Sequence, residues 1–187
     1  PDQGLYEPRP PEGSAFIRFI HGADKGAAKE IKVNDKAFGT LEFKNVSSYF
    51  VIPEGATDVL MGDAFHQFNA KAGAFYTAVL NDDSALSVIP DETNDNRAKA
   101  QVTFYNLTDK PGLSVKTASG DIDIIPPTAK EESRVKQINP VEVSLGVYHE
   151  GQLLKNLGVV SLERGASYSI VAYNETDVLW VQATTDT

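Results

Sequence analysis

Residues 15–25 read Ala-Phe-Ile-Arg-Phe-Ile-His-Gly-Ala-Asp-Lys, and residues 100–110 read Ala-Gln-Val-Thr-Phe-Tyr-Asn-Leu-Thr-Asp-Lys. Each stretch is a short run of residues that favour strands, and each closes with a polar Asp-Lys turn. The second stretch begins at position 100 and the first at 15, an offset of 85. Self-similarity at this distance predicts a duplicated domain and not a solenoid, whose repeats span about 20–50 residues.

A second pair of matching stretches supports the duplication. Residues 73–79 read Gly-Ala-Phe-Tyr-Thr-Ala-Val, and residues 165–171 read Gly-Ala-Ser-Tyr-Ser-Ile-Val, an offset of 92. A longer loop in the second copy explains why this offset exceeds the first by seven (92 against 85). Residues 91–99 lie between the copies, carry no apolar anchor and follow Pro90. That composition predicts a linker.

Strand signals recur through both halves of the chain. Short runs such as 29–33, 49–52 and 168–173 are separated by turn residues about every 8–12 positions, as in a sandwich or barrel. No stretch sustains the apolar period of an amphipathic helix. We therefore predict an all-β chain of two tandem β-sandwich domains joined by a short polar linker. The predicted parts are an N-terminal extended segment at 1–14, domain 1 at 15–90, the linker at 91–99 and domain 2 at 100–187.

Composition excludes several classes of function. The chain has 187 residues, no cysteine and a net charge of −9. Its acidity is spread along the chain, with −2 in 1–14, −2 in 15–90, −1 in 91–99 and −4 in 100–187. Nucleic acids and anionic membranes bind clustered cations, so neither is an expected partner. The same charge disfavours tight binding of a polyanionic polysaccharide. Without cysteine there are no disulfides, thiol chemistry or thiolate metal sites.

The sequence also predicts where the protein resides. No run approaches the roughly 18 apolar residues that a membrane-spanning helix needs, so the chain is not expected to span a membrane. The first residues are Pro-Asp-Gln-Gly, with no initiator methionine. This start suggests a processed or trimmed N-terminus, which is compatible with the removal of a signal peptide.

The most suggestive acid–base pair is Asp63 and His66, three residues apart. This spacing resembles the dyad of SGNH-type acetylesterases and acetyltransferases. Such chemistry also needs a serine nucleophile and oxyanion donors. Neither a Gly-Asp-Ser block nor a G-x-S-x-G elbow is present. We therefore predict no enzyme activity and no catalytic residue, with His66 on a strand or hairpin between Phe65 and Phe68.

The other polar candidates favour structural roles. His21 occupies the position that Asn106 has in the second copy, which favours a capping or turn role for both. His149 precedes Glu150-Gly151 and predicts a hairpin tip. Three scattered histidines lack metal-ligand spacing. The acidic pairs 91–92 and 121/123 lack the ligand density of a calcium loop. No metal or other cofactor is expected.

Aromatic residues raise the alternative of sugar binding, because β-sandwich modules stack sugars on exposed rings. The candidate rings are Tyr6, Tyr49, Tyr105, Tyr148, Tyr173 and Trp180. Most of them alternate in phase with aliphatic residues and are expected in the core or half-buried. Trp180, in the last apolar run, is also expected in the core. Tyr6, in the Pro-rich N-terminal segment, is the expected exception.

Several stretches, in the order in which they occur, resemble the AlgF family. They are Gly-Leu-Tyr-Glu-Pro at 4–8, Pro-Glu-Gly-Ser-Ala-Phe-Ile-Arg at 11–18, Asn-Leu-Thr-Asp-Lys-Pro at 106–111, Val-Lys-Thr-Ala at 115–118, Ile-Asn-Pro-Val-Glu-Val-Ser-Leu at 138–145 and Leu-Glu-Arg-Gly at 162–165. The resemblance spans nearly the whole chain. It is strong over 100–165 and loose over 30–90, which leaves a role with another exopolysaccharide open.

The resemblance implies a periplasmic protein of two tandem β-sandwiches that has no catalytic activity of its own. It also implies export with a cleaved signal peptide that is not present in this chain. Its relatives act in alginate O-acetylation beside a membrane-bound O-acyltransferase and periplasmic SGNH-type O-acetyltransferases. We therefore expect an adaptor that brings these partners together or positions one of them, with at most weak contact with the polysaccharide. The alternatives are a carbohydrate-binding protein that holds the polymer, an acetyltransferase acting through Asp63 and His66, and a structural envelope protein. The candidate partner contacts are the loop residues Asn139, Pro140, Glu163 and Arg164.

Overall fold

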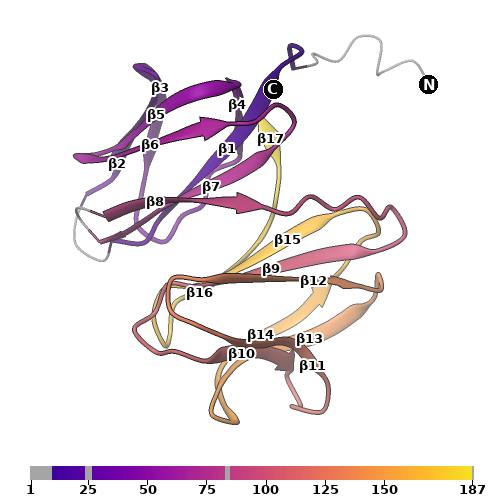
Figure 1. Cartoon of the computed structure of the whole chain (residues 1–187). Coiled ribbons are helices and arrows are strands. Elements are labelled where there is room, and N and C mark those ends of the chain that lie inside the picture. The colour runs from indigo at the N-terminus through magenta and orange to yellow at the C-terminus, as the bar shows by residue number, and fades with distance from the viewer. Residues whose placement is uncertain (1–9, 24–26, 83–84, 187) are drawn as a thin grey trace. The chain divides into compact units, whose positions relative to one another are not determined.

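The computed structural model describes residues 10–23, 27–82 and 85–186. Every regular element in these ranges is a β-strand, which confirms the all-β prediction (Figure 1). Within the same ranges, no helix has the length and apolar character needed to cross a membrane. The chain divides into two compact units, which contain Pro1–Asp91 with Thr184–Thr187 and Glu92–Ala183 respectively. They are called unit 1 and unit 2 below.

Unit 1 contains two sheets. One has the order β17-β4-β1-β7-β8 and the other β3-β2-β5-β6. Their strands are β1 (Ser14–His21), β2 (Lys29–Val33), β3 (Lys36–Leu41), β4 (Tyr49–Pro53), β5 (Gly55–Met61), β6 (Ala64–Ala70), β7 (Phe75–Asp82), β8 (Ala85–Asp91) and β17 (Thr185–Asp186). Ala15, Ile17 and Phe19 alternate along β1 and are fully buried in the core of this unit. The period-2 pattern of the sequence therefore places one face of β1 on the core.

Unit 2 repeats this topology strand for strand. Its sheets have the orders β12-β9-β15-β16 and β11-β10-β13-β14, so each strand has its counterpart eight places earlier. The strands are β9 (Ala100–Asn106), β10 (Leu113–Thr117), β11 (Asp123–Thr128), β12 (Ser133–Ile138), β13 (Glu142–His149), β14 (Gln152–Ser161), β15 (Ser167–Ala172) and β16 (Val178–Gln182). Its own core contains Val102, Phe104 and Ile170, all fully buried. Two β-sandwiches of one topology confirm the duplication.

The strand register matches the two sequence offsets. In unit 1, β1 runs parallel to β7 with Phe16 opposite Phe75. In unit 2, β9 runs parallel to β15 with Gln101 opposite Ser167. Positions 16 and 101 differ by 85, and positions 75 and 167 differ by 92. Because a slip by one residue would exchange the buried and outer faces, both copies retain one register.

Each copy also retains a tyrosine that ties its sheet to the preceding loop. The Lys71 N–H donates to the Tyr76 hydroxyl at 2.9 Å in unit 1, and the Glu163 N–H donates to the Tyr168 hydroxyl at 3.0 Å in unit 2. The tyrosine follows its partner by five residues in both cases. This contact resembles the tyrosine corner of immunoglobulin-like sandwiches.

We expect Tyr168→Phe to destabilise unit 2 by about 1 kcal/mol, because the Glu163 N–H loses its acceptor. The measurement is urea unfolding followed by tryptophan fluorescence. Trp180 is the chain's one tryptophan, and its ring stacks on that of Tyr168 with centroids 5.0 Å apart. Tyr76→Phe is the control, since it removes the equivalent bond from unit 1 and should leave the Trp180 transition in place. Equal shifts for the two variants would contradict the assignment.

Two stretches differ from the predicted boundaries. Residues 92–99, predicted as a linker, belong to unit 2. The Asn94 side chain donates to Lys99 O at 2.9 Å and to Ala166 O at 3.3 Å, so hydrogen bonds fix this polar segment. The end of the predicted 100–187 domain belongs to unit 1, where β17 pairs in parallel with β4. Of the predicted N-terminal segment, residues 1–9 lie outside the described ranges, and Ser14 already begins β1.

Candidate functional site

The turn that follows β9 is organised by the side chain of Asn106, which is fully buried. Its amide nitrogen donates to Lys110 O at 2.8 Å and to Thr128 O at 3.0 Å. Its carbonyl oxygen accepts from the Thr108 N–H at 3.0 Å and from the Thr108 hydroxyl at 2.7 Å. One amide therefore makes four hydrogen bonds inside the protein, and two of its partners have a second contact: Thr128 O also accepts from the Gly112 N–H at 3.0 Å, and Lys110 O from the Thr108 hydroxyl at 3.3 Å. The Asn-Leu-Thr-Asp-Lys stretch is a rigid turn.

His21 has the corresponding position in unit 1 and is likewise fully buried. Its Nδ1 lies 3.3 Å from the Ala23 N–H, and its Nε2 lies 3.3 Å from Ala27 O. A neutral ring protonated on Nε2 satisfies both contacts. The ring edge also packs on Phe43, with centroids 5.9 Å apart. These contacts confirm the predicted turn role for His21 and for Asn106.

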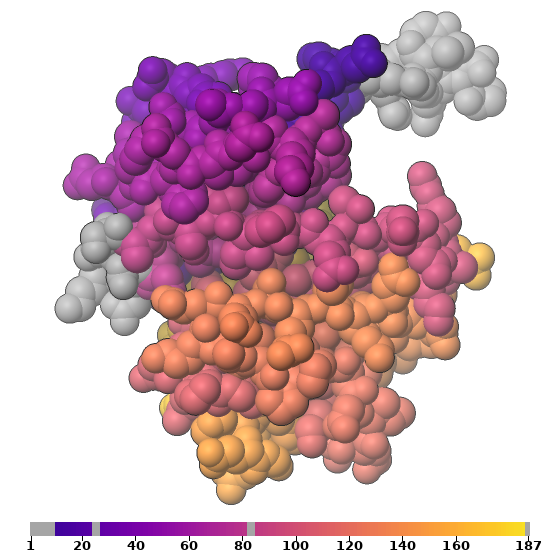
Figure 2. Space-filling view, viewed as in Figure 1, coloured from indigo at the N-terminus to yellow at the C-terminus, as the bar shows by residue number. Residues whose placement is uncertain are grey.

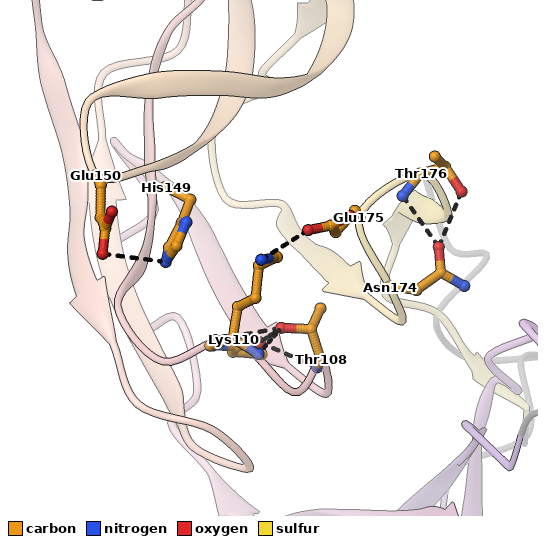
Figure 3. Close-up of polar contacts among 8 residues, drawn as sticks. Thr108, Lys110, His149, Glu150, Asn174, Glu175 and Thr176 are labelled. Atoms are coloured by element: carbon orange, nitrogen blue, oxygen red, sulfur yellow. Dashed lines mark hydrogen bonds and ion pairs between the residues drawn. The ribbon is translucent and has the colours of Figure 1, made fainter.

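Three polar turns lie at the end of unit 2 that contains Asn106 (Figure 3). We call this surface the loop end, defined by residues 107–112, 149–151 and 173–177. Because β9 and β15 are parallel, with Asn106 opposite Ala172, the turns that follow them emerge at the same end of the sheet. Lys110 Nζ lies 2.8 Å from Glu175 Oε1 and joins two of the turns.

The other contacts of the loop end are local. The Asn174 side chain accepts from the N–H groups of Thr176 at 3.0 Å and Asp177 at 2.7 Å. His149 pairs with Gln152 across a two-residue turn, which confirms the predicted hairpin tip. That turn consists of Glu150 and Gly151 with φ values of 51° and 81°, as a tight hairpin requires. His149 Nε2 lies 3.8 Å from Glu150 Oε1 (Figure 3).

A groove of about 690 Å³ begins beside the loop end. Its apolar lining includes Ile124, Pro126 and Pro127 of β11, and Lys116 and Lys136 contribute cations. Lys116 is not free for an anion, because its Nζ lies 3.6 Å from Asp123 Oδ1 and 5.4 Å from the Tyr148 ring centroid. The groove can receive an apolar or mixed side chain. It offers no pair of groups arranged for acid–base chemistry.

The predicted partner contacts gather at the opposite end of the strands. They are Asn139, Pro140, Glu163 and Arg164. Lys99 links the two loops, since its ammonium donates to Asn139 Oδ1 at 2.8 Å and its carbonyl accepts from the Gly165 N–H at 2.8 Å. Pro140 is half-buried and the other three residues are exposed. The structure thus brings the four residues to one surface, and their role in binding remains a prediction.

Asp63 and His66 lie on the hairpin between β5 and β6. Gly62 and Asp63 form its two-residue turn, and Gly62 has a φ of 59° there. His66 is half-buried on β6, opposite Val59 of the neighbouring strand. Among the hydrogen bonds identified between described residues, none joins His66 to Asp63 or to a serine. His66 therefore has the structural position expected of it, on a hairpin between Phe65 and Phe68.

The acidic residues of the pairs 91–92 and 121/123, which were considered for calcium binding, have other contacts or face solvent. Asp121 and Asp123 are exposed, and Asp123 faces Lys116. Asp91 ends β8 and accepts a hydrogen bond from the Tyr49 hydroxyl at 2.6 Å. No group of three or more potential metal-ligating side chains occurs within the described ranges.

The rings considered for sugar binding are mostly enclosed. Tyr49, Tyr105, Tyr148 and Tyr173 are each at most 8% exposed. Trp180 is half-buried against the core of unit 2, and Tyr168 stacks on one of its faces. Tyr6 lies outside the described residues. A sugar stacks on an exposed ring face, and the four described tyrosines are too deeply buried to offer one.

A buried polar cluster in unit 1 escaped the sequence analysis. Arg18 is only 2% exposed, and its Nε donates to Thr77 Oγ1 at 2.9 Å. Thr77 in turn donates to Asp91 Oδ2, which also accepts from the Tyr49 hydroxyl. The guanidinium carbon lies 4.9 Å from the centroid of the Tyr49 ring. The sequence offered one sign of this cluster, an arginine inside the apolar run 15–20. The three partners of Arg18 could not be recognised, because they are remote from it in the sequence.

Comparison with known proteins places these features in a family. The chain matches the family model described as "Alginate O-acetyl transferase AlgF" over residues 1–169. It is 28% identical over 188 residues to "Alginate biosynthesis protein AlgF" of Pseudomonas putida, an alignment that covers 96% of this chain and 84% of that protein.

Two solved structures are similar to parts of the chain. The C-terminal domain of AlgF from P. aeruginosa matches with 27% identity and a TM-score of 0.41, over 46% of this chain and 98% of that domain. The N-terminal domain of the same protein matches with 18% identity and a TM-score of 0.40, over 45% of this chain and all of that domain (100%). Because the family match alone extends across unit 1 and through residue 169 of unit 2, this chain belongs to the AlgF family of alginate biosynthesis proteins.

Proposed function

We propose that this protein is a non-catalytic periplasmic adaptor of alginate O-acetylation. It brings together or positions acetyltransferase partners, namely periplasmic SGNH-type O-acetyltransferases and a membrane-bound O-acyltransferase complex. Membership of the AlgF family supports the pathway. The assignment to an adaptor rests on the character of its surfaces.

The observation that carries the proposal is the burial of the four described tyrosines that the sequence offered as sugar platforms. The four tyrosines that could act as stacking platforms are at most 8% exposed. The exposed turns at both ends of unit 2 carry charged and amide side chains instead. Such turns can form hydrogen bonds and charge pairs with a protein partner, and the lining of the groove beside the loop end contains no aromatic ring on which a sugar could stack.

Charge also favours a protein partner over the polymer. The chain has a net charge of −9, and alginate is a polyuronate with one carboxylate on each sugar. Two polyanions repel each other unless clustered cations intervene. Lys110 and Lys116, two cations beside the groove and the loop end, lie within ion-pair distance of Glu175 and Asp123. At these two positions a uronate carboxylate would have to compete with a carboxylate of the chain itself.

The duplication supports a bridging role. Each unit has its own core and the same strand topology, so one chain presents two related modules. When one module binds a partner, the effective concentration of a second partner at the other module rises without any new contact. An adaptor gains from this arrangement, and an enzyme with a single active site does not need it.

The test is titration calorimetry with the purified chain. One experiment adds the periplasmic acetyltransferases of the same organism, and another adds polymannuronate free of protein. We expect heat of binding with a protein partner and none with the polymer. The control is the polymer at raised salt, since binding between two polyanions that emerges only at high ionic strength is not specific. Heat with the polymer alone would overturn the adaptor and establish the carbohydrate-binding alternative.

A further inference from the structure

The outer edge of β12 carries unpaired backbone groups. β12 ends its sheet and pairs only with β9 in the described sheet order. The Asn106 N–H donates to Glu132 O at 3.0 Å, so Glu132 directs its backbone groups toward β9. Alternation along an antiparallel pair then directs those of Arg134 and Lys136 inward and those of Ser133, Val135 and Gln137 outward. Free edges of this kind accept an added strand.

The corresponding edge in unit 1 is occupied. There β17 pairs in parallel with β4, with Thr185 opposite Tyr49 and Asp186 opposite Phe50. The Tyr49 N–H donates outward to Thr184 O at 2.8 Å. The duplicated sheet therefore has the geometry to accept a parallel strand at this edge, and unit 1 fills the position with the chain's own C-terminal residues.

Superposing the two registers identifies the equivalent positions on β12. Ile52 lies opposite Ala15 in unit 1, and Ile138 lies opposite Ala100 in unit 2. Because Ala15 and Ala100 are the repeat's shared first position, Val135 corresponds to Tyr49 and Lys136 to Phe50. The outward N–H of Val135 is thus the counterpart of the donor that binds the added strand in unit 1.

The charges of β12 specify what kind of strand fits. Arg134 and Lys136 are exposed, and β12 carries no acidic residue. By the colour bar of the space-filling view, the residues around β12 are drawn in orange (Figure 2). Lys136 takes the position that in unit 1 faces Asp186. An added strand with an acidic residue at the corresponding position would bring a carboxylate near the Lys136 ammonium. Cations on an edge strand also discourage pairing with unselected strands.

We propose that β12 binds an extended acidic segment of the acetyltransferase partner by parallel strand addition. Backbone hydrogen bonds to Ser133, Val135 and Gln137 would supply the affinity, and the two cations would supply the selectivity. This inference rests on the proposed function, because it names the surface through which the adaptor binds its partner. It differs from the loop residues considered above, none of which lies on β12.

The first test replaces Val135 with proline. Proline removes the outward N–H and leaves the bonds to β9, which Arg134 and Lys136 make, so an edge strand tolerates it. Val135→Ala is the matched control, since it shortens the same side chain and keeps the N–H. With the purified periplasmic acetyltransferase as probe, we expect V135P to weaken binding about tenfold or more and V135A to weaken it by less than about threefold. The Trp180 unfolding transition checks that both variants are folded.

The second test reverses a charge without altering the backbone. Lys136→Glu is expected to weaken binding about tenfold and to reduce its salt dependence. The control is Lys71→Glu, which makes the same charge change at an exposed position of unit 1 and should leave binding unchanged. Hydrogen exchange on the unmodified complex should show slower exchange at the amides of Val135 and Gln137.

The outcomes separate this inference from the adaptor itself. If no acetyltransferase binds the unmodified chain, the proposed function fails. If one binds with equal affinity to V135P, V135A and K136E, and the β12 amides remain unprotected, the adaptor stands and the β12 site is wrong. If V135P instead abolishes self-association in sedimentation experiments and leaves acetyltransferase binding intact, a second copy occupies the edge and the proposal is overturned.

Discussion

Replacing Asn106 with alanine is expected to lower the free energy of unfolding of unit 2 by about 3 kcal/mol. The variant removes the four hydrogen bonds of this buried side chain: the Thr108 N–H loses its acceptor, and Lys110 O and Thr128 O each lose one of two donors. A buried polar group that loses its hydrogen bond costs about 1–3 kcal/mol, and solvent that enters the loosened turn recovers part of the sum. Urea unfolding followed by Trp180 fluorescence measures the change.

Asn174→Ala is the matched control for this result. Asn174 also accepts hydrogen bonds from the N–H groups of Thr176 and Asp177, but it lies in a partly exposed turn where water can replace them. We expect a loss of about 1 kcal/mol or less there. Asn106→Asp should be as harmful as alanine, because a carboxylate cannot donate to Lys110 O and Thr128 O. Equal stabilities for the Asn106 and Asn174 variants would show that the Asn106 amide does not organise the turn.

Replacing Asp91 with alanine is expected to destabilise unit 1 by about 3 kcal/mol. Arg18 is 2% exposed and is linked to Asp91 through Thr77, so the variant removes the negative charge and the final acceptor of this buried network. Breaking a buried charge network by removing one member is costly for this reason, and the partial exposure of Asp91 moderates the loss. Calorimetric unfolding, together with hydrogen exchange at β1 and β7, measures the change in unit 1.

A second substitution tests the cause of this loss. In the Asp91→Ala background, Arg18→Met removes the positive charge of the buried guanidinium and should restore part of the stability. The control for the single change is Asp58→Ala. Asp58 is exposed, accepts from Gln67 at 2.8 Å and should contribute less than about 0.5 kcal/mol. Strictly additive losses for Asp91→Ala and Arg18→Met would show that the two side chains do not act as one network.

Local patterns predicted the features that depend on residues close in sequence. The repeat at 15–25 and 100–110 predicted two domains, and the parallel strand pairs of both units reproduce its offsets. The turn roles of His21 and Asn106 followed from their place between a strand and an Asp-Lys turn. The hairpin tip at 150–151 followed from its glycine. Each of these depends on alternation or on turn chemistry within a few residues.

Polar composition did not show whether a segment is free. Residues 92–99 have the composition of a linker, but Asn94 binds Lys99 and Ala166 and ties the segment to unit 2. Asn94 and Ala166 are 72 residues apart. An asparagine that binds a distant carbonyl cannot be told from one that faces water by the residues around it. The sequence therefore contained no local signal for the contact between Asn94 and Ala166.

The position of β17 had the same difficulty. Two residues that pair with β4 carry no alternating pattern long enough to predict a strand. Their partner Tyr49 lies far away in the sequence, and the pairing uses backbone groups that every residue has. The contrast between an occupied β4 edge and an unpaired β12 edge, on which the docking proposal rests, is therefore absent from the sequence.

The amino-acid sequence alone established the strand content, the duplication and the core faces, because apolar alternation and turn residues act over a few positions at a time. Tertiary structure alone decided which polar groups meet. It joined Arg18 to Thr77 and Asp91, brought the loops of Asn139 and Glu163 to one end of unit 2, and left the edge of β12 open. These outcomes depend on the order of strands in the sheets. That order follows from packing two complete faces together, which no short stretch of residues encodes.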